Sequence, residues 1–463
     1  MAALLACPLI AFGGTTREVA FVYGTGCLLA ATVLGVRVQG TLDMALALLA
    51  GGVVAQIIPI PAALGQMLSP HRREVVEALR LSAHHELRST VSSIDVPSTI
   101  WALAVLGGSI AYFWIARRQF GRGGVRQTVR IVAGLGFAMS LLAVSQAATA
   151  GDLIYWRFPT GFEGPPPFGP FINRNHFATW TIMAVPLCFG YVAARLGTER
   201  TVPKHSSLRG RVVRAFDPRT AWLTTAGTTM LVALLLSLSR SGALSLGVAT
   251  AITFACCRHR LERRHRRLVL SATLGVLLAG VVWADVPALV RRAATAPAAM
   301  ADRATIWRES VPIVRDFWRV GTGAGTYQAA MFRYQQSDRR VYFNQAHNHY
   351  LQVAVEGGVL LVGLTLFAAV RFIREARRRI AEDTSGLVLI RVGAVCGLGA
   401  VALQSVWETG LVMPANAALA ALLAAIAVHE PVAPAGRPVG EQGQPRLSPA
   451  ADQPDLTVEE RPQ

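Results

Sequence analysis

The sequence predicts an all-α polytopic membrane protein with about twelve transmembrane helices of about 20 residues each and one large, partly helical outer loop. Of its 463 residues, 52% are hydrophobic and only 16% are charged, which is too little polar surface to enclose a soluble core. Apolar runs of bilayer-spanning length recur along the chain. The basic residues behind the net charge of +18 form short clusters between those runs, a pattern that indicates membrane topology and excludes a nucleic-acid-binding face.

The expected spans are, in order, residues 2–13, 19–36, 42–60, 98–116, 127–146, 176–195, 220–237, 242–257, 268–285, 350–370, 386–406 and 412–428. The first run is short, and it forms either a span or half of a re-entrant hairpin with the second. It lacks the basic start and the small-residue cleavage site of a signal peptide.

The loops divide into two sets by charge. Clusters of Lys and Arg occupy residues 117–126, 195–219, 258–267 and 371–379. All four clusters fall on one side of the membrane, which the positive-inside rule makes the cytoplasm. The other set, residues 61–97, 147–175 and 286–349, then lies outside.

Four regions follow from this organisation: helices 1 to 9 within residues 1–285, the outer loop 286–349, helices 10 to 12 within residues 350–428, and the tail 429–463. We expect the outer loop to carry the catalytic residues. The tail is rich in Pro, Gly, Ala and Gln, and it is expected to be a disordered cytoplasmic segment. The six cysteines fall in or at the ends of spans with no zinc spacing, so no metal and no cofactor is predicted.

The most informative stretch is AHNHYLQVAVEGGVLLVG, residues 346–363. We expect His347 to begin a helix, where the helix dipole keeps its ring neutral and able to accept a proton. Glu356 lies nine residues further on, on the opposite face of an unbroken helix. The partner that orients His347 is therefore sought in Asn348, Asn344 or an acid of the outer loop. The alternative is a structural histidine.

Arginines supply the second candidate group. Arg240 stands in a short turn, LSLSRSGALSL, between two spans, where its planar fork suits a diphosphate; alternatively its side chain only reaches the interface. The outer loop holds nine arginines, Arg303 and Arg308 among them, and this excess favours an anionic partner such as pyrophosphate. Pairing with lipid headgroups or with neighbouring acids is the other interpretation.

A third group lies in GPFINRNHFATW, residues 169–180. It brings Arg174, Asn175 and His176 to the outer end of the sixth span, where they either bind sugar hydroxyls or phosphate or cap the helix. The glycines of GTGAGT, residues 321–326, are better explained as a turn than as a nucleotide loop, because no Lys follows them and no strand precedes them.

Taken together, these segments resemble the O-antigen ligase and polymerase family of bacterial inner-membrane proteins. The similarity covers AQIIPIPAALGQMLSP (55–70), NRNHFA, SRSG, DRATIWRESVPIVRDFWRVGTGAGTY (302–327) and HNHYLQVAVEGG (347–358). Two positions depart from the family pattern: Leu361 stands where a small residue is common, and His349 where an acid is more usual.

The resemblance implies a metal-independent glycosyltransferase of the inner membrane, with its active site facing the periplasm. It would transfer a glycan from an undecaprenyl pyrophosphate carrier to lipid A core or to a growing glycan, with membrane lipids around it. The catalytic histidine of the family falls on His347 and its two functional arginines on Arg240 and Arg303; Asn348, Arg174, Asn175, His176 and Arg308 are the expected substrate contacts. A transporter or flippase of lipid-linked glycans, or a non-catalytic assembly scaffold, is the alternative.

Overall fold

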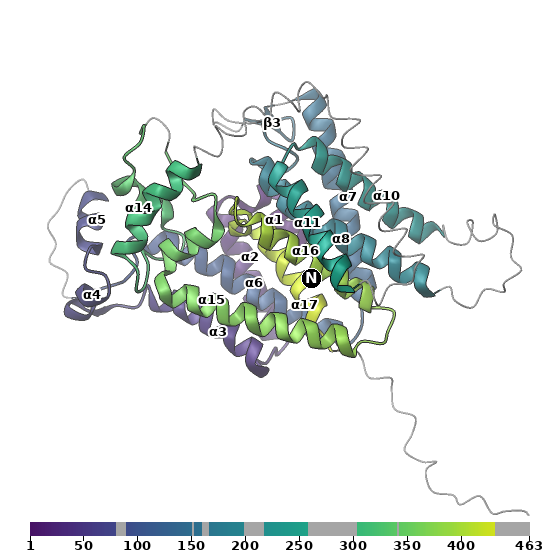
Figure 1. Ribbon diagram of the computed structural model, residues 1–463, viewed down its shortest axis with the longest axis horizontal. Helices are drawn as coiled ribbons and strands as arrows, with labels where there is room; N and C mark the ends of the chain where they lie inside the picture. The colour runs from purple at the N-terminus through teal and green to yellow at the C-terminus, as the bar shows by residue number, and fades with distance from the viewer. Residues whose placement is uncertain are drawn as a thin grey trace, which may run out of the picture.

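The computed structural model describes residues 1–79, 89–150, 152–159, 166–198, 217–257, 303–339 and 342–430, and most of them are helical (Figure 1). The α-helices are α1 (Ala2–Ile10), α2 (Arg17–Val33), α3 (Gly40–Ala55), α4 (Ala62–Leu68), α5 (Arg72–Leu79), α6 (Val96–Phe120), α7 (Val125–Thr149), α8 (Arg174–Thr198), α10 (Pro218–Leu236), α11 (Arg240–Cys257), α14 (Tyr327–Tyr334), α15 (His349–Glu382), α16 (Val388–Gln404) and α17 (Pro414–Val428). Residues 303–316 are also helical.

Two short 3-10 helices, η1 (Phe12–Gly14) and η3 (Gly410–Val412), accompany them. The described residues also contain two antiparallel pairs of two-residue strands, β1 (Ile60–Pro61) with β2 (Ser89–Thr90) and β3 (Leu153–Ile154) with β4 (Phe158–Pro159). Both pairs lie in loops that were expected outside the membrane.

Membrane-spanning character is clearest in α6, α7, α8 and α15, which are long and apolar enough to cross a bilayer. Four shorter apolar helices, α3, α11, α16 and α17, accompany them. The first run is a helix of 9 residues, about 14 Å at 1.5 Å per residue, which is too short to cross alone. The predicted span 268–285, the first part of the outer loop and the tail from residue 431 lie outside the described residues.

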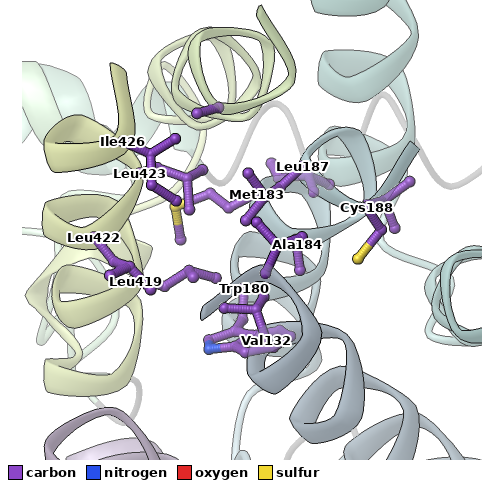
Figure 2. Close-up of a cluster of buried hydrophobic side chains, with 14 of the residues drawn as sticks. Val132, Trp180, Met183, Ala184, Leu187, Cys188, Leu419, Leu422, Leu423 and Ile426 are labelled. Atoms are coloured by element: carbon purple, nitrogen blue, oxygen red, sulfur yellow. The ribbon is translucent and has the colours of Figure 1, made fainter. Parts of the chain in front are cut away.

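The main core is built around α8, whose apolar window is the most deeply buried of the four long helices. Trp180 and Met183 of α8 lie toward Leu419 and Leu423 of α17 in Figure 2, and Leu187 belongs to the same buried cluster. Small residues bring α16 equally close, since a Cβ placed on Gly393 would lie 2.4 Å from the Pro186 carbonyl oxygen. In a lipid bilayer the hydrophobic effect does not drive helices together, so transmembrane helices pack through close backbone contacts at small residues of this kind.

The helix ends that the sequence assigns to the outer side lie together at one end of the bundle. Hydrogen bonds join Arg17 to Ser98, Ile94 to Thr322, His349 to Ser405 and Thr409 to Gln345. A Cβ on Gly242 near the start of α11 would lie 2.9 Å from the Ala178 Cβ near the start of α8. The candidate segments, although far apart in sequence, therefore meet in space.

A second, smaller core lies beyond that end of the bundle. It combines α5 with residues 303–316, α14 and the start of α15, and its buried side chains include Val75, Ile313, Phe317, Met331 and Val355. Figure 1 shows α4, α5 and α14 gathered beside one end of α15. The described part of the outer loop is thus a folded cap.

The GTGAGT segment joins this cap to α15. Glu356 accepts hydrogen bonds from the backbone N–H groups of Gly325 at 2.8 Å and Tyr327 at 3.2 Å, which caps the start of α14. Gly358 breaks α15 with φ 55° and ψ −160°, and a Cβ there would lie 2.6 Å from the Trp318 carbonyl oxygen. The segment is therefore a turn, and the EGG triplet of α15 is its docking site.

Leu361, where the family that the chain resembles commonly has a small residue, packs without a defect. It is 5% exposed, and a Cβ on Gly52 of α3 would lie 2.8 Å from its Cδ2. The absence of a side chain at Gly52 leaves room for the leucine.

Candidate active site

Glu408 is the centre of the candidate site, and it lies in the short link between α16 and α17. Its side chain is 1% exposed. Oε1 accepts hydrogen bonds from Arg303 Nη2 at 2.8 Å and from Asn175 Nδ2 at 2.6 Å. Its other oxygen, Oε2, has no hydrogen-bond partner among the described residues and lies 3.6 Å from His347 Nδ1. A buried carboxylate is stable when charged and polar groups surround it in this way.

His347 precedes α15 by two residues, so the expectation that it begins the helix is wrong. Asn348 is the N-cap, and its side chain accepts from Leu351 N at 3.0 Å. His347 has φ 46°, a left-handed conformation that costs about 1–3 kcal/mol for a residue other than glycine and persists only where surrounding structure enforces it. The helix dipole therefore acts on this ring less directly than the sequence suggested.

Three hydrogen bonds enforce this conformation, and they are made by residues just before and just after His347. Trp307 Nε1 donates to the Ala346 carbonyl at 3.0 Å, and His349 N donates to the Ser405 carbonyl at 2.8 Å. Thr409 Oγ1 donates to Gln345 Oε1 at 2.5 Å. The same link that carries Glu408 thus positions the histidine loop, which leaves the His347 side chain 31% exposed.

The third segment that contributes to the site is NRNH, residues 173–176, beside Glu408 and the loop of His347. Asn173 Oδ1 accepts from Asn175 N at 2.8 Å, which fixes the turn before α8 and aims the Asn175 amide at Glu408. His176 is buried, and its Nε2 has no hydrogen-bond partner among the described residues. It lies within electrostatic range of both Glu408 and His347. Asn175 therefore supports the carboxylate, while His176 adds a second imidazole beside it.

The remaining predicted residues lie around this centre. Arg240 is exposed at the first position of α11, beside the start of α8. Arg174 is the first residue of α8. Arg308 is exposed on the helix of Arg303, about 140° further round at 100° per residue. Asn348 is engaged as the helix cap.

Sequence reasoning missed Glu408, and neither Asn348, Asn344 nor an acid of the outer loop takes its place beside His347 in the described structure. The sequence nevertheless contains a signal that could have identified Glu408. Glu408 is the only Asp, Glu, Lys or Arg between Arg391 and Glu430, and it stands between two apolar runs at an outer end. A single carboxylate in such a position is a functional candidate by default.

No group of three or more His, Cys, Asp or Glu side chains within the described ranges is arranged to hold a metal ion. The described side chains around Glu408 are one guanidinium, one amide and two imidazoles, from Arg303, Asn175, His347 and His176. One arginine offsets the carboxylate, and His347 is accessible to solvent.

Comparison with known proteins shows that part of the chain is similar to one family. Residues 226–368 match the family model described as O-antigen ligase. This range includes Arg240, Arg303, Arg308, His347 and Asn348, and it supports assignment of the chain to the O-antigen ligase and polymerase family. No curated protein and no solved structure matches the chain.

Proposed function

We propose, from the chain's place in the O-antigen ligase and polymerase family, that it transfers a glycan from an undecaprenyl pyrophosphate carrier to an acceptor hydroxyl. The acceptor is lipid A core in a ligase and a growing glycan in a polymerase. The reaction takes place at the periplasmic face of the bacterial inner membrane, at the bundle end that carries Glu408.

The observation that carries this proposal is the convergence on one buried carboxylate. Arg303, Asn175 and His347 come from three separate segments and all approach Glu408. A structural histidine needs no such arrangement. A general base needs an orienting partner and an accessible second nitrogen.

In the proposed step, the acceptor hydroxyl oxygen attacks the anomeric carbon of the donor sugar. The new C–O bond forms as the bond from that carbon to the pyrophosphate oxygen breaks, and lipid pyrophosphate leaves with the electron pair. His347 Nε2 takes the hydroxyl proton. Direct attack inverts the configuration at the anomeric carbon.

Glu408 is a positioning residue in this scheme. It faces His347 Nδ1, so a proton on that nitrogen is directed at the carboxylate and Nε2 is left as the acceptor. As His347 gains the hydroxyl proton, the nearby negative charge stabilises the imidazolium that forms.

Arg303 and Arg240 bind the pyrophosphate. Arg303 donates to Glu408 through Nη2, and a guanidinium has five N–H donors in all, so others are left for phosphate oxygens. Arg240 stands at the start of α11, where backbone N–H groups also favour an anion. Arg174 and Arg308 are the proposed contacts to sugars and phosphates at the edge of the site. Asn175 holds Glu408, Asn348 caps α15 and His176 is buried, so these three contribute to the substrate site by shaping its wall.

The test is a deletion strain complemented with wild type or His347→Ala at matched protein levels in membranes. Loss of the base should reduce turnover about 10²-fold or more. Long glycan that stays on the carrier, with bare lipid A core, identifies a ligase; single repeats identify a polymerase. A surface polysaccharide profile that His347→Ala leaves unchanged would refute the role of the base and favour a flippase or a scaffold.

A further inference from the structure

A basic cavity of about 1140 Å³ lies at the opposite end of α15 from His347. It is bounded by the link between α2 and α3, the end of α6 and the second half of α15. Seven arginines line it against two glutamates: Arg37, Arg117, Arg118, Arg371, Arg374, Arg378 and Arg379, with Glu375 and Glu430. Its volume is slightly above the range for small-molecule sites, about 300–1,000 Å³.

Some of these arginines are held in place by the protein. Arg117 Nη2 lies 2.5 Å from Asp43 Oδ2, and Asp43 is fully buried behind the cavity wall. Arg379 Nε lies 2.8 Å from Glu375 Oε1. Arg378 also pairs with Glu375 and Glu382, and Arg118 and Arg371 donate to the Gly35 carbonyl and to Thr41 Oγ1. These contacts engage five of the seven lining arginines.

Two of the arginines that line the cavity are not engaged by these contacts. Arg37 and Arg374 are both exposed and have no ion-pair or hydrogen-bond partner among the described residues. A cavity with excess positive charge and unpaired guanidinium groups matches an anionic ligand, because a guanidinium binds phosphate oxygens through its planar fork.

Exposed apolar side chains are neighbours in sequence of the lining arginines. Val38 follows Arg37, and Val370 and Ile373 stand beside Arg371 and Arg374 on α15; all three are exposed. A soluble phosphate compound has no apolar groups that could contact these side chains. A ligand with a phosphate head and acyl chains would contact both parts.

The cavity also lies at the depth where lipid headgroups lie. From Asn348 to Arg371 is 23 residues, or about 35 Å along a continuous helix, and the break at Gly358 shortens this. The hydrocarbon core of a bilayer is about 30 Å thick. When the His347 end is at one surface, the cavity is at the other.

We propose that this cavity binds the phosphate headgroup of an acidic phospholipid from the leaflet opposite the His347 site. The acyl chains lie along the exposed apolar surface of α15, and the headgroup is held by Arg37 and Arg374. This site is separate from the catalytic centre and does not depend on the proposed reaction.

The experiment is a titration of the purified full-length chain with diphosphatidylglycerol, followed by native mass spectrometry, with phosphatidylcholine as the neutral lipid. Each arginine near an anionic headgroup contributes about a factor of five in affinity. Arg374→Gln should weaken diphosphatidylglycerol binding about fivefold, and Arg37→Gln with Arg374→Gln about 25-fold. The thermal unfolding curve should be unchanged, because neither side chain is bonded within the described structure.

The matched control is Arg377→Gln. It removes the same charge from the same helix at an exposed position that does not line the cavity, and binding should stay within about twofold of wild type. An equal loss in Arg374→Gln and Arg377→Gln would overturn the proposal in favour of diffuse surface attraction. Equal binding of phosphatidylcholine, or displacement of the lipid by inorganic pyrophosphate at equal concentration, would also overturn it.

Discussion

Glu408→Gln is the sharpest test of the candidate active site, because it removes one charge and preserves the shape of the side chain. At the 3.6 Å between Glu408 Oε2 and His347 Nδ1, two unit charges attract by about 5 kcal/mol at an effective dielectric of about 20. Arg303 already offsets part of the carboxylate charge, and His347 is 31% exposed. After these two reductions, about half of that attraction should act on the imidazolium of His347. The loss of this half in Glu408→Gln should lower kcat about 10²-fold.

The assay is transfer of glycan from a purified lipid-linked donor, with kcat and donor KM measured separately. Glu408→Gln should lower kcat and leave donor KM within a few-fold, because the carboxylate acts on the base. In a chain with His347→Ala, the same change should have almost no further effect, since residues that act as one unit are not additive. Asn175→Ala, which removes a hydrogen bond to Glu408 and keeps its charge, is the control and should cost less than about tenfold. Wild-type kcat in Glu408→Gln at normal protein levels, or a full 10²-fold loss added to that of His347→Ala, would refute the reasoning.

Two further changes test the donor site and the docking of the cap. Arg303→Lys keeps the charge but loses the fork, so donor KM should rise about tenfold, as measured in the same assay; an unchanged KM would remove Arg303 from donor binding. Gly358→Ala places a Cβ 2.6 Å from the Trp318 carbonyl in a backbone conformation open almost only to glycine, and it should destabilise the protein by more than about 2 kcal/mol. Thermal unfolding in detergent measures this, and an unshifted midpoint would show that the break in α15 is dispensable.

The sequence predicted the helical class and the polar segments that meet at one end of the bundle, because apolar periodicity and polar motifs at span ends are local signals. It did not predict which of those segments touch. The pairing of Asn175 with Glu408 joins residues 233 positions apart, and nothing local to either residue encodes that pairing. The start of α15 was misplaced by two residues for a similar reason: Asn348 is the cap because Ser405 and Thr409 hold the preceding loop.

Glu356 shows the reverse case, where a local argument set a partner of His347 aside and the structure gives that residue other partners, although His347 lies outside the helix on which the argument relied. Helical spacing placed its carboxylate away from His347, and in the structure that carboxylate caps α14 instead. Its actual role depends on the turn at residues 321–326, which the sequence marked only by glycines. Periodicity can exclude a contact within one helix, whereas it has no information on contacts between helices.

The position of Glu408 along the chain has a consequence for biogenesis. The side chains that need this carboxylate are all made earlier, with Arg303 synthesised 105 residues before it. During translation the cluster is therefore incomplete until the link between α16 and α17 emerges and both helices are inserted. A nascent chain that has placed its histidine loop but has not yet made α16 and α17 lacks Glu408, so the cluster is assembled only after both helices are present.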